Sequence, residues 1–241
     1  MASDANAVEL VDRLGMIVIR GTDGESAVEK AAAEALEAIE AGGDRASIEA
    51  NKRAILMAQR SFYLGFFQRG EGREREAERL FERAAETARE AVRERPTSEG
   101  MRVLSDALQQ LLELRGSLYQ LLNFRAARDA AFEAIELDNE NPAAYLAAVS
   151  YLATAPAAGG GDKEEAQRYL DRASALLADR DDTSSVMNLR FLVAVWQALL
   201  EASKGNTNAS SRAFERAEEI YPENWWLAEM RAAVTDDLRN Q

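Results

Sequence analysis

Few residues in this chain interrupt a helix, and this shortage constrains the fold more than any other feature. Among the 241 residues there are four prolines and 14 glycines, whereas alanine recurs in runs such as residues 31–33. Alanine has the highest intrinsic helix propensity, and proline and glycine have the lowest. The sequence therefore predicts an all-α protein. A chain of this length can form one sizeable hydrophobic core.

Helix boundaries are visible in the N-terminal third of the sequence. Ser26 and Glu29 have the spacing of a capping box, which predicts a helix to about Ala41. Glycines end that helix, and Asp44 is placed to cap the next one. Further helices are predicted over residues 45–69, 73–93, 99–120, 124–137, 142–155, 163–177, 184–203, 207–220 and 225–238.

Two later helix starts are marked more strongly. Asn141 precedes Pro142, a cap followed by proline at the first helical position. Asp162 and Glu165 repeat the capping-box spacing. The glycines of residues 157–161 are predicted to form a loop between helices. They do not form a phosphate-binding loop, because that motif needs a preceding strand and a following Lys-Ser or Lys-Thr.

Composition excludes several kinds of chemistry. The chain contains no cysteine and no histidine. Disulfides, thiol nucleophiles, histidine-dependent triads and the usual zinc sites are therefore excluded. Acidic side chains are plentiful, but no spacing singles out a pair for acid–base catalysis. We therefore expect a protein that is not an enzyme and has no cofactor.

The net charge of −13 narrows the choice of partners. A phosphate backbone or an anionic membrane surface would be repelled overall, so nucleic acid is not an expected partner. A basic partner would be attracted. The acidic loop at residues 179–182 lacks the ligand spacing and the glycine of a calcium loop, so we interpret it as a solvated turn and expect no metal site.

The predicted helices come in pairs, and the residue spacing within them recurs. Small and large apolar residues alternate at similar intervals in three helices, each near a similar turn. The recurring positions are Ala127, Ala131, Ala134 and Leu137; Ala166, Leu170, Ala173 and Leu176; and Ser210, Phe214, Ala217 and Pro222.

These residues resemble the second helix and terminal turn of the bacterial type of tetratricopeptide repeat, TPR. The resemblance covers about residues 102–227, and the sequence before Pro96 departs from the pattern. It implies antiparallel helix hairpins stacked into a right-handed superhelix. Residues 1–100 would be divergent hairpins continuous with this solenoid, and residues 101–241 would be TPR-like repeats with a C-terminal capping helix.

The resemblance also implies a function, a non-catalytic interaction scaffold that holds a partner segment on its concave face. The lining predicted for that face is small, apolar and weakly polar, which fits a partner with basic residues and apolar anchors. Trp225 and Trp226 open the last helix and are candidates for an interface at the end of the solenoid. The predicted groove residues are Leu112, Glu113, Tyr119, Gln120, Leu146, Ser150 and Thr154.

An alternative of another class stays open at this point. Some periplasmic TPR proteins that accompany solute transporters have an apolar ligand-binding bowl or pore, and the divergent N-terminal hairpins would suit such a bowl. The compartment is unknown from the sequence: as written, it shows no signal peptide and no transmembrane segment, as a cytoplasmic protein would. A trimmed signal peptide would instead indicate a periplasmic or lipid-anchored one. Self-association is also compatible with the sequence.

Overall fold

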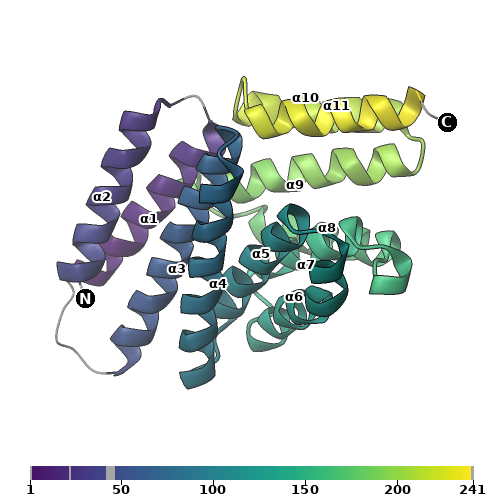
Figure 1. The fold of residues 1–241 in the computed structure, drawn as a ribbon. Helices are drawn as coiled ribbons and strands as arrows, with labels where there is room; N and C mark the ends of the chain where they lie inside the picture. The colour runs from purple at the N-terminus through teal and green to yellow at the C-terminus, as the bar shows by residue number, and fades with distance from the viewer. Residues whose placement is uncertain (1, 22, 42–46, 240–241) are drawn as a thin grey trace.

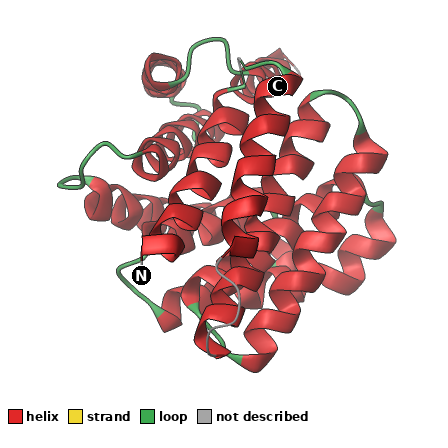
Figure 2. Ribbon diagram, turned by 90° about the vertical axis from the view of Figure 1, so that its left-hand side faces the viewer, coloured by secondary structure: helices red, strands yellow, loops and turns green. Residues whose placement is uncertain are grey.

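The structure is a computed structural model that describes residues 2–21, 23–41 and 47–239. In these ranges the chain forms eleven α-helices and one short 3-10 turn, with no strand. Figure 2 shows helices throughout, joined by short loops. The predicted all-α fold is confirmed, while the stacking into a right-handed superhelix stays a prediction.

Most helices begin and end close to the predicted residues. Five of them, α7 to α11, begin at the predicted residue. The helices are α1 (Ala2–Arg20), α2 (Glu25–Ala41), α3 (Ser47–Gly70), α4 (Glu74–Glu94), α5 (Ser98–Leu114), α6 (Ser117–Leu137), α7 (Pro142–Thr154), α8 (Lys163–Leu177), α9 (Ser184–Ser203), α10 (Thr207–Ile220) and α11 (Trp225–Arg239), with the 3-10 turn η1 at Ala157–Gly159.

The strongest predicted caps are present. The Asn141 side chain accepts a hydrogen bond from the backbone N–H of Ala143 at 3.0 Å, and Asp162 caps α8 through two backbone N–H groups. Such caps satisfy backbone donors that have no partner within the helix. At α2 the prediction was wrong by two residues, because the helix already begins at Glu25 and Ser26 lies in its first turn. The predicted cap Asp44 lies outside the described residues.

Two predictions about the helices need correction. Helix α1 was not predicted, although it buries Val11, Leu14 and Val18. The predicted helix over residues 99–120 is broken, because Arg115 and Gly116 have extended backbone conformations that end α5 and begin α6. Arg115 is held at this break by the carboxylates of Glu78 and Glu82 on α4.

Consecutive helices pair as antiparallel hairpins, and alanine residues lie where they pack most closely. Helix α1 pairs with α2, α3 with α4, α5 with α6, α7 with α8 and α9 with α10. Six alanines that the repeat spacing assigned to the core have no exposed surface: Ala127, Ala131, Ala134, Ala166, Ala173 and Ala217. Small side chains allow two helix backbones to approach each other closely, so these six alanines lie in the core, whereas Leu137 and Pro222 of the same spacing are exposed.

The first helices of the five hairpins also contact one another in sequence. Helix α1 packs on α3, α3 on α5, α5 on α7 and α7 on α9. The series then closes, because α9 packs against α1, so that the green C-terminal helices lie beside the purple N-terminal ones in Figure 1. These five helices form an inner ring.

We call the contact that closes this ring the end junction; it joins α1 and α3 to α9 and the start of α11. The side-chain amide of Asn224 donates to the backbone carbonyl of Ile19 at the end of α1. Its oxygen accepts from the N–H of Leu227 at 2.8 Å, which caps α11. Trp225 lies against Gly70, where an added Cβ would come within 2.7 Å of the indole ring. This junction therefore depends on one amide and on the absence of a side chain at one glycine.

Candidate functional site

A cavity of about 590 Å³ lies inside the ring of helices. Its walls come from the five inner helices, from the loop before α7 and from the start of α11. Pockets of about 300–1,000 Å³ are typical of small-molecule sites. The cavity has the size of such a site, and residues from both ends of the chain complete it.

One wall of the cavity is aromatic. Phe62 and Phe66 on α3 meet Trp196 on α9 and Trp226 on α11. The ring centroids of Phe66 and Trp226 are 6.0 Å apart, and those of Trp196 and Trp226 are 6.3 Å apart. These edge-to-face contacts fix the orientation of the rings. We call these four residues the aromatic wall.

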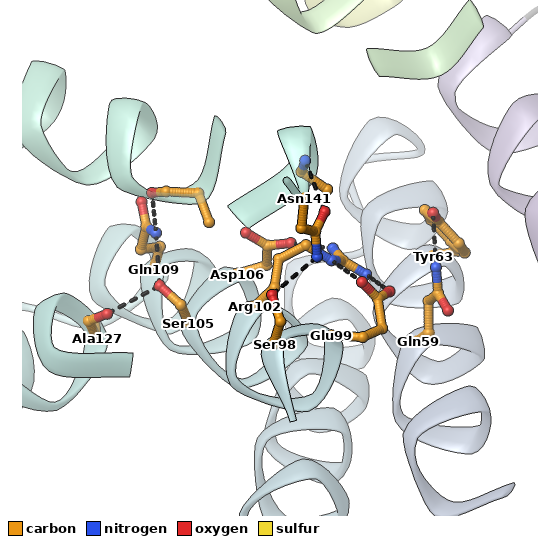
Figure 3. Close-up of polar contacts among 12 residues, drawn as sticks. Gln59, Tyr63, Ser98, Glu99, Arg102, Ser105, Asp106, Gln109, Ala127 and Asn141 are labelled. Atoms are coloured by element: carbon orange, nitrogen blue, oxygen red, sulfur yellow. Dashed lines mark hydrogen bonds and ion pairs between the residues drawn. The ribbon is translucent and has the colours of Figure 1, made fainter. Parts of the chain in front are cut away.

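The cavity is also lined by a charge cluster on α5. Arg102, which is 8% exposed, is bound by Glu99 through two of its nitrogens and by Asp106 through a third (Figure 3). The closest nitrogen–oxygen distance to each carboxylate is 2.5 Å. All three residues line the cavity. Because its guanidinium is engaged by two carboxylates, Arg102 is poorly placed to bind an anion as well.

Burial and the charge of Arg102 shift the pKa values of Asp106 and Glu99 in opposite directions. Burial raises the pKa of the Asp106 carboxyl to about 6, although the charge of Arg102 opposes this. Burial also disfavours the charged form of Glu99, but the charge and the hydrogen bonds of Arg102 outweigh it and hold the pKa of Glu99 below its usual value. The bidentate contact explains the difference. Near neutral pH both carboxylates are mainly ionised.

A third carboxylate faces this cluster from another helix. Asp12 on α1 lines the cavity, and among the described residues its carboxylate has no hydrogen bond or ion pair of its own. Burial, together with the nearby charge of Glu99, raises the pKa of Asp12 to about 6, against the opposing effect of Arg102. A raised pKa of this kind indicates a carboxylate whose charge is incompletely compensated.

A second acceptor without a partner lies further along α5. Gln109 lines the cavity and is 6% exposed. Its amide nitrogen donates to the Ser105 hydroxyl and to the backbone carbonyl of Ala147, both at 3.0 Å (Figure 3). Its buried Oε1 accepts no hydrogen bond from the described residues. An unpaired buried acceptor is costly, so this oxygen reduces the stability of the wall behind the cavity.

The predicted groove residues separate into two groups. Leu146 and Ser150 on α7 line the cavity. Glu113 instead pairs with Arg69, the amide of Gln120 donates to the carbonyl of Leu112, and Tyr119 lies beneath the Arg115 guanidinium at 4.6 Å. Thr154 is exposed on α7. Leu112, Glu113, Tyr119, Gln120 and Thr154 are not among the cavity-lining residues.

The two tryptophans at the start of α11 lie in the end junction. Trp225 packs against Gly70 and Phe66, and Trp226 belongs to the aromatic wall. Both are partly buried. Through these contacts the two tryptophans join α11, which carries them, to α3 and α9.

Sequence reasoning missed the charged residues of the cavity. Asp12, Glu99, Arg102 and Asp106 were not singled out among 42 acidic and 29 basic residues. A usable signal existed on α5, where Arg102 follows Glu99 by three residues and precedes Asp106 by four within a mostly apolar helix. Asp12 gave a similar signal, because it lies between Val11 and Leu14 in a buried segment.

Comparisons with known proteins assign no family. No family model matches the chain, and no curated protein matches it. No described helix is long and apolar enough to cross a membrane. The described residues also contain no cluster of three acidic side chains placed to hold a metal ion.

Proposed function

We propose that this protein binds a small molecule inside its ring of helices, as a non-catalytic ligand-handling protein. The observation that supports the proposal is the cavity of about 590 Å³, which combines an aromatic wall with a charge cluster around Arg102. Apolar lining with a few placed polar groups is the usual composition of a ligand site. This is the bowl-like alternative of the sequence analysis, and a role beside a solute transporter is one use of such a bowl.

A pair of tryptophan substitutions on α7 tests the proposal. Ser150→Trp places a large ring inside the cavity, whereas Thr154→Trp places the same ring on the exposed surface one turn later. The probe is N-phenyl-1-naphthylamine, an uncharged dye whose fluorescence rises in apolar sites. We expect the wild type and the Thr154→Trp variant to bind one dye each, and Ser150→Trp to bind it at least tenfold more weakly.

The comparison of the two variants decides the outcome. Circular dichroism spectra of both variants should match that of the wild type, so that a loss of dye binding reports on the cavity and not on unfolding. Equal dye binding by the two tryptophan variants, or no saturable binding by the wild type, would overturn the proposal.

One observation favours a second function, the interaction scaffold expected from the TPR resemblance. Leu118, Leu121 and Leu122 at the start of α6 are between 69% and 72% exposed and lie on one helical face. We call them the leucine face. Exposed apolar clusters are typical of protein contacts. Leu121→Gln with Leu122→Gln should then abolish capture of a partner while dye binding continues; capture that is unaffected would contradict this second function.

A further inference from the structure

The charges inside the cavity do not cancel, and this restricts the chemistry of a ligand. Three carboxylates, on Asp12, Glu99 and Asp106, face one guanidinium, on Arg102. With all four groups ionised, this cluster carries a net charge of −2, three carboxylates against one guanidinium. A negative charge that is partly shielded from water and has no partner is unfavourable, so this cluster favours a ligand that carries positive charge.

The hydrogen-bonding groups of the cavity indicate the same chemistry. Arg102 already donates to Glu99 and Asp106. By contrast, the Asp12 carboxylate lines the cavity and accepts no hydrogen bond from the described residues. A ligand that complements this group supplies N–H or O–H donors.

The aromatic wall adds a third reason. Phe66, Trp196 and Trp226 present ring surfaces in the same cavity. Aromatic faces attract cations and also cover apolar groups. Lys52, Arg95 and Arg180 line the cavity as well, but they are solvent-exposed. Solvent and salt therefore screen their charges far more than those of the interior.

We propose that the cavity selects an organic cation, with an ammonium group beside Asp12 and an apolar body along the aromatic wall. This inference rests on the proposed function and deepens it by naming the ligand class. The ammonium supplies N–H donors and positive charge to the side that lacks both. The apolar body displaces solvent from the rings.

Three probes of similar shape and different charge test the inference. They are tryptamine, indole-3-ethanol and indole-3-propionate, which are cationic, neutral and anionic at pH 7.5. Isothermal titration of the full chain should show tryptamine binding at least tenfold more tightly than either of the others. An equal or greater affinity for indole-3-propionate would overturn the assignment of a cation.

A pair of neutralised carboxylates on α1 locates the effect. Asp12→Asn should reduce the preference for tryptamine at least fivefold, whereas Glu9→Gln, at an exposed position of the same helix, should leave it unchanged. Asp12→Asn should still bind the uncharged dye, since the shape of the cavity is retained. A preference for tryptamine that is the same in Asp12→Asn as in the wild type would contradict the role of Asp12.

The preference of the cavity for tryptamine over the neutral and anionic probes should also weaken in mild acid. Between pH 7.5 and pH 5, Asp12 and Asp106 become protonated, while alkylammonium groups stay charged because their pKa is about 10. The other groups near them are Glu99 and Arg102 on α5, Tyr63 on α3 and the exposed Lys52, Arg95 and Arg180. A tryptamine affinity that does not change with pH would count against the inference.

The two proposals fail in distinguishable ways. Dye binding without any preference for tryptamine would refute the cation and leave small-molecule binding intact. Absence of saturable binding for the dye and for all three indole probes would refute both.

Discussion

The junctions between consecutive hairpins and the end junction are built in different ways. Between α3 and α6, buried alanines such as Ala84 and Ala107 pack with Phe81 and Leu108 in one continuous cluster. At the end junction, larger side chains such as Phe191 and Tyr221 pack around Ile19, and Asn224 joins the two ends of the chain. The first kind of contact repeats along the chain, and the second occurs once.

Because of this difference, we expect the hairpin junctions to determine mainly the stability of the protein and the end junction to determine mainly its ligand binding. The hairpin junctions bury most of the alanine core, so they should dominate the free energy of unfolding. The end junction instead positions Trp226 and the α1 helix that carries Asp12, both of which line the cavity. Substitutions in the two regions should therefore affect stability and ligand binding in different proportions.

The largest effect is expected from enlarging a hairpin alanine. Ala134→Leu should lower the free energy of unfolding by about 3 kcal/mol, the upper end of the range for overpacking, because Ala134 has no exposed surface. Urea denaturation measures the change, with Ala175→Leu at an exposed position of α8 as the control. Dye binding should persist at temperatures where the variant is folded. Equal stability of the two variants would contradict the close packing inferred at Ala134.

A smaller loss of stability and a larger loss of binding are expected at the end junction. Asn224→Ala removes the cap of α11 and leaves the Ile19 carbonyl without that donor, which should cost about 2 kcal/mol. Dye affinity should fall at least fivefold because Trp226 is then less well positioned. The control is Asn206→Ala, at an exposed asparagine before α10. If Asn224→Ala bound the dye as tightly as this control, the two junctions would not differ as described.

The smallest effect concerns pH. The folded-state pKa of Asp12 is raised from 3.8 to about 6. This carboxyl group therefore favours the folded state while protonated, and that contribution is lost as the pH rises through about 6. Asp12→Asn should consequently be more stable than the wild type at pH 8, by about 1 kcal/mol after allowance for solvent screening.

The free energies of unfolding of the wild type and of Asp12→Asn should become equal in acid. Denaturation at several pH values should show the difference shrinking towards zero near pH 4, with Glu9→Gln following the wild type throughout. A wild type that is as stable as Asp12→Asn at pH 8 would show that the charge of Asp12 is fully compensated in the empty cavity.

Local signals in the sequence predicted most of the helices, but they did not predict the contacts between residues that are far apart in the chain. The caps at Asn141 and Asp162 and the buried position of Ala134 follow from spacing within one or two turns. The break at Gly116 was missed because apolar residues continue through it. Leu146 and Ser150 were predicted for the concave face and do line the cavity.

The charged part of the cavity could not be found in the same way. Asp12 meets the α5 cluster only because α1 packs on both α3 and α9. Nothing in the local sequence of α1 encodes that contact. The partner of Asn224 is likewise 205 residues away in the chain. The spacing of residues within neighbouring helices gives no information about a contact at that separation.

This separation has a consequence for how the protein is made. During synthesis the N-terminal helices emerge first, and their hairpins pack through neighbouring residues. The ring stays open until α9 has been made, and Trp226 is added still later, so the complete cavity does not exist on the nascent chain. Closing so long a loop is entropically costly, and the end junction is expected to form last on folding and to open first on unfolding. Ligand capture would then belong to the finished molecule alone, and transient separation of its two ends would set the slowest rate of exchange.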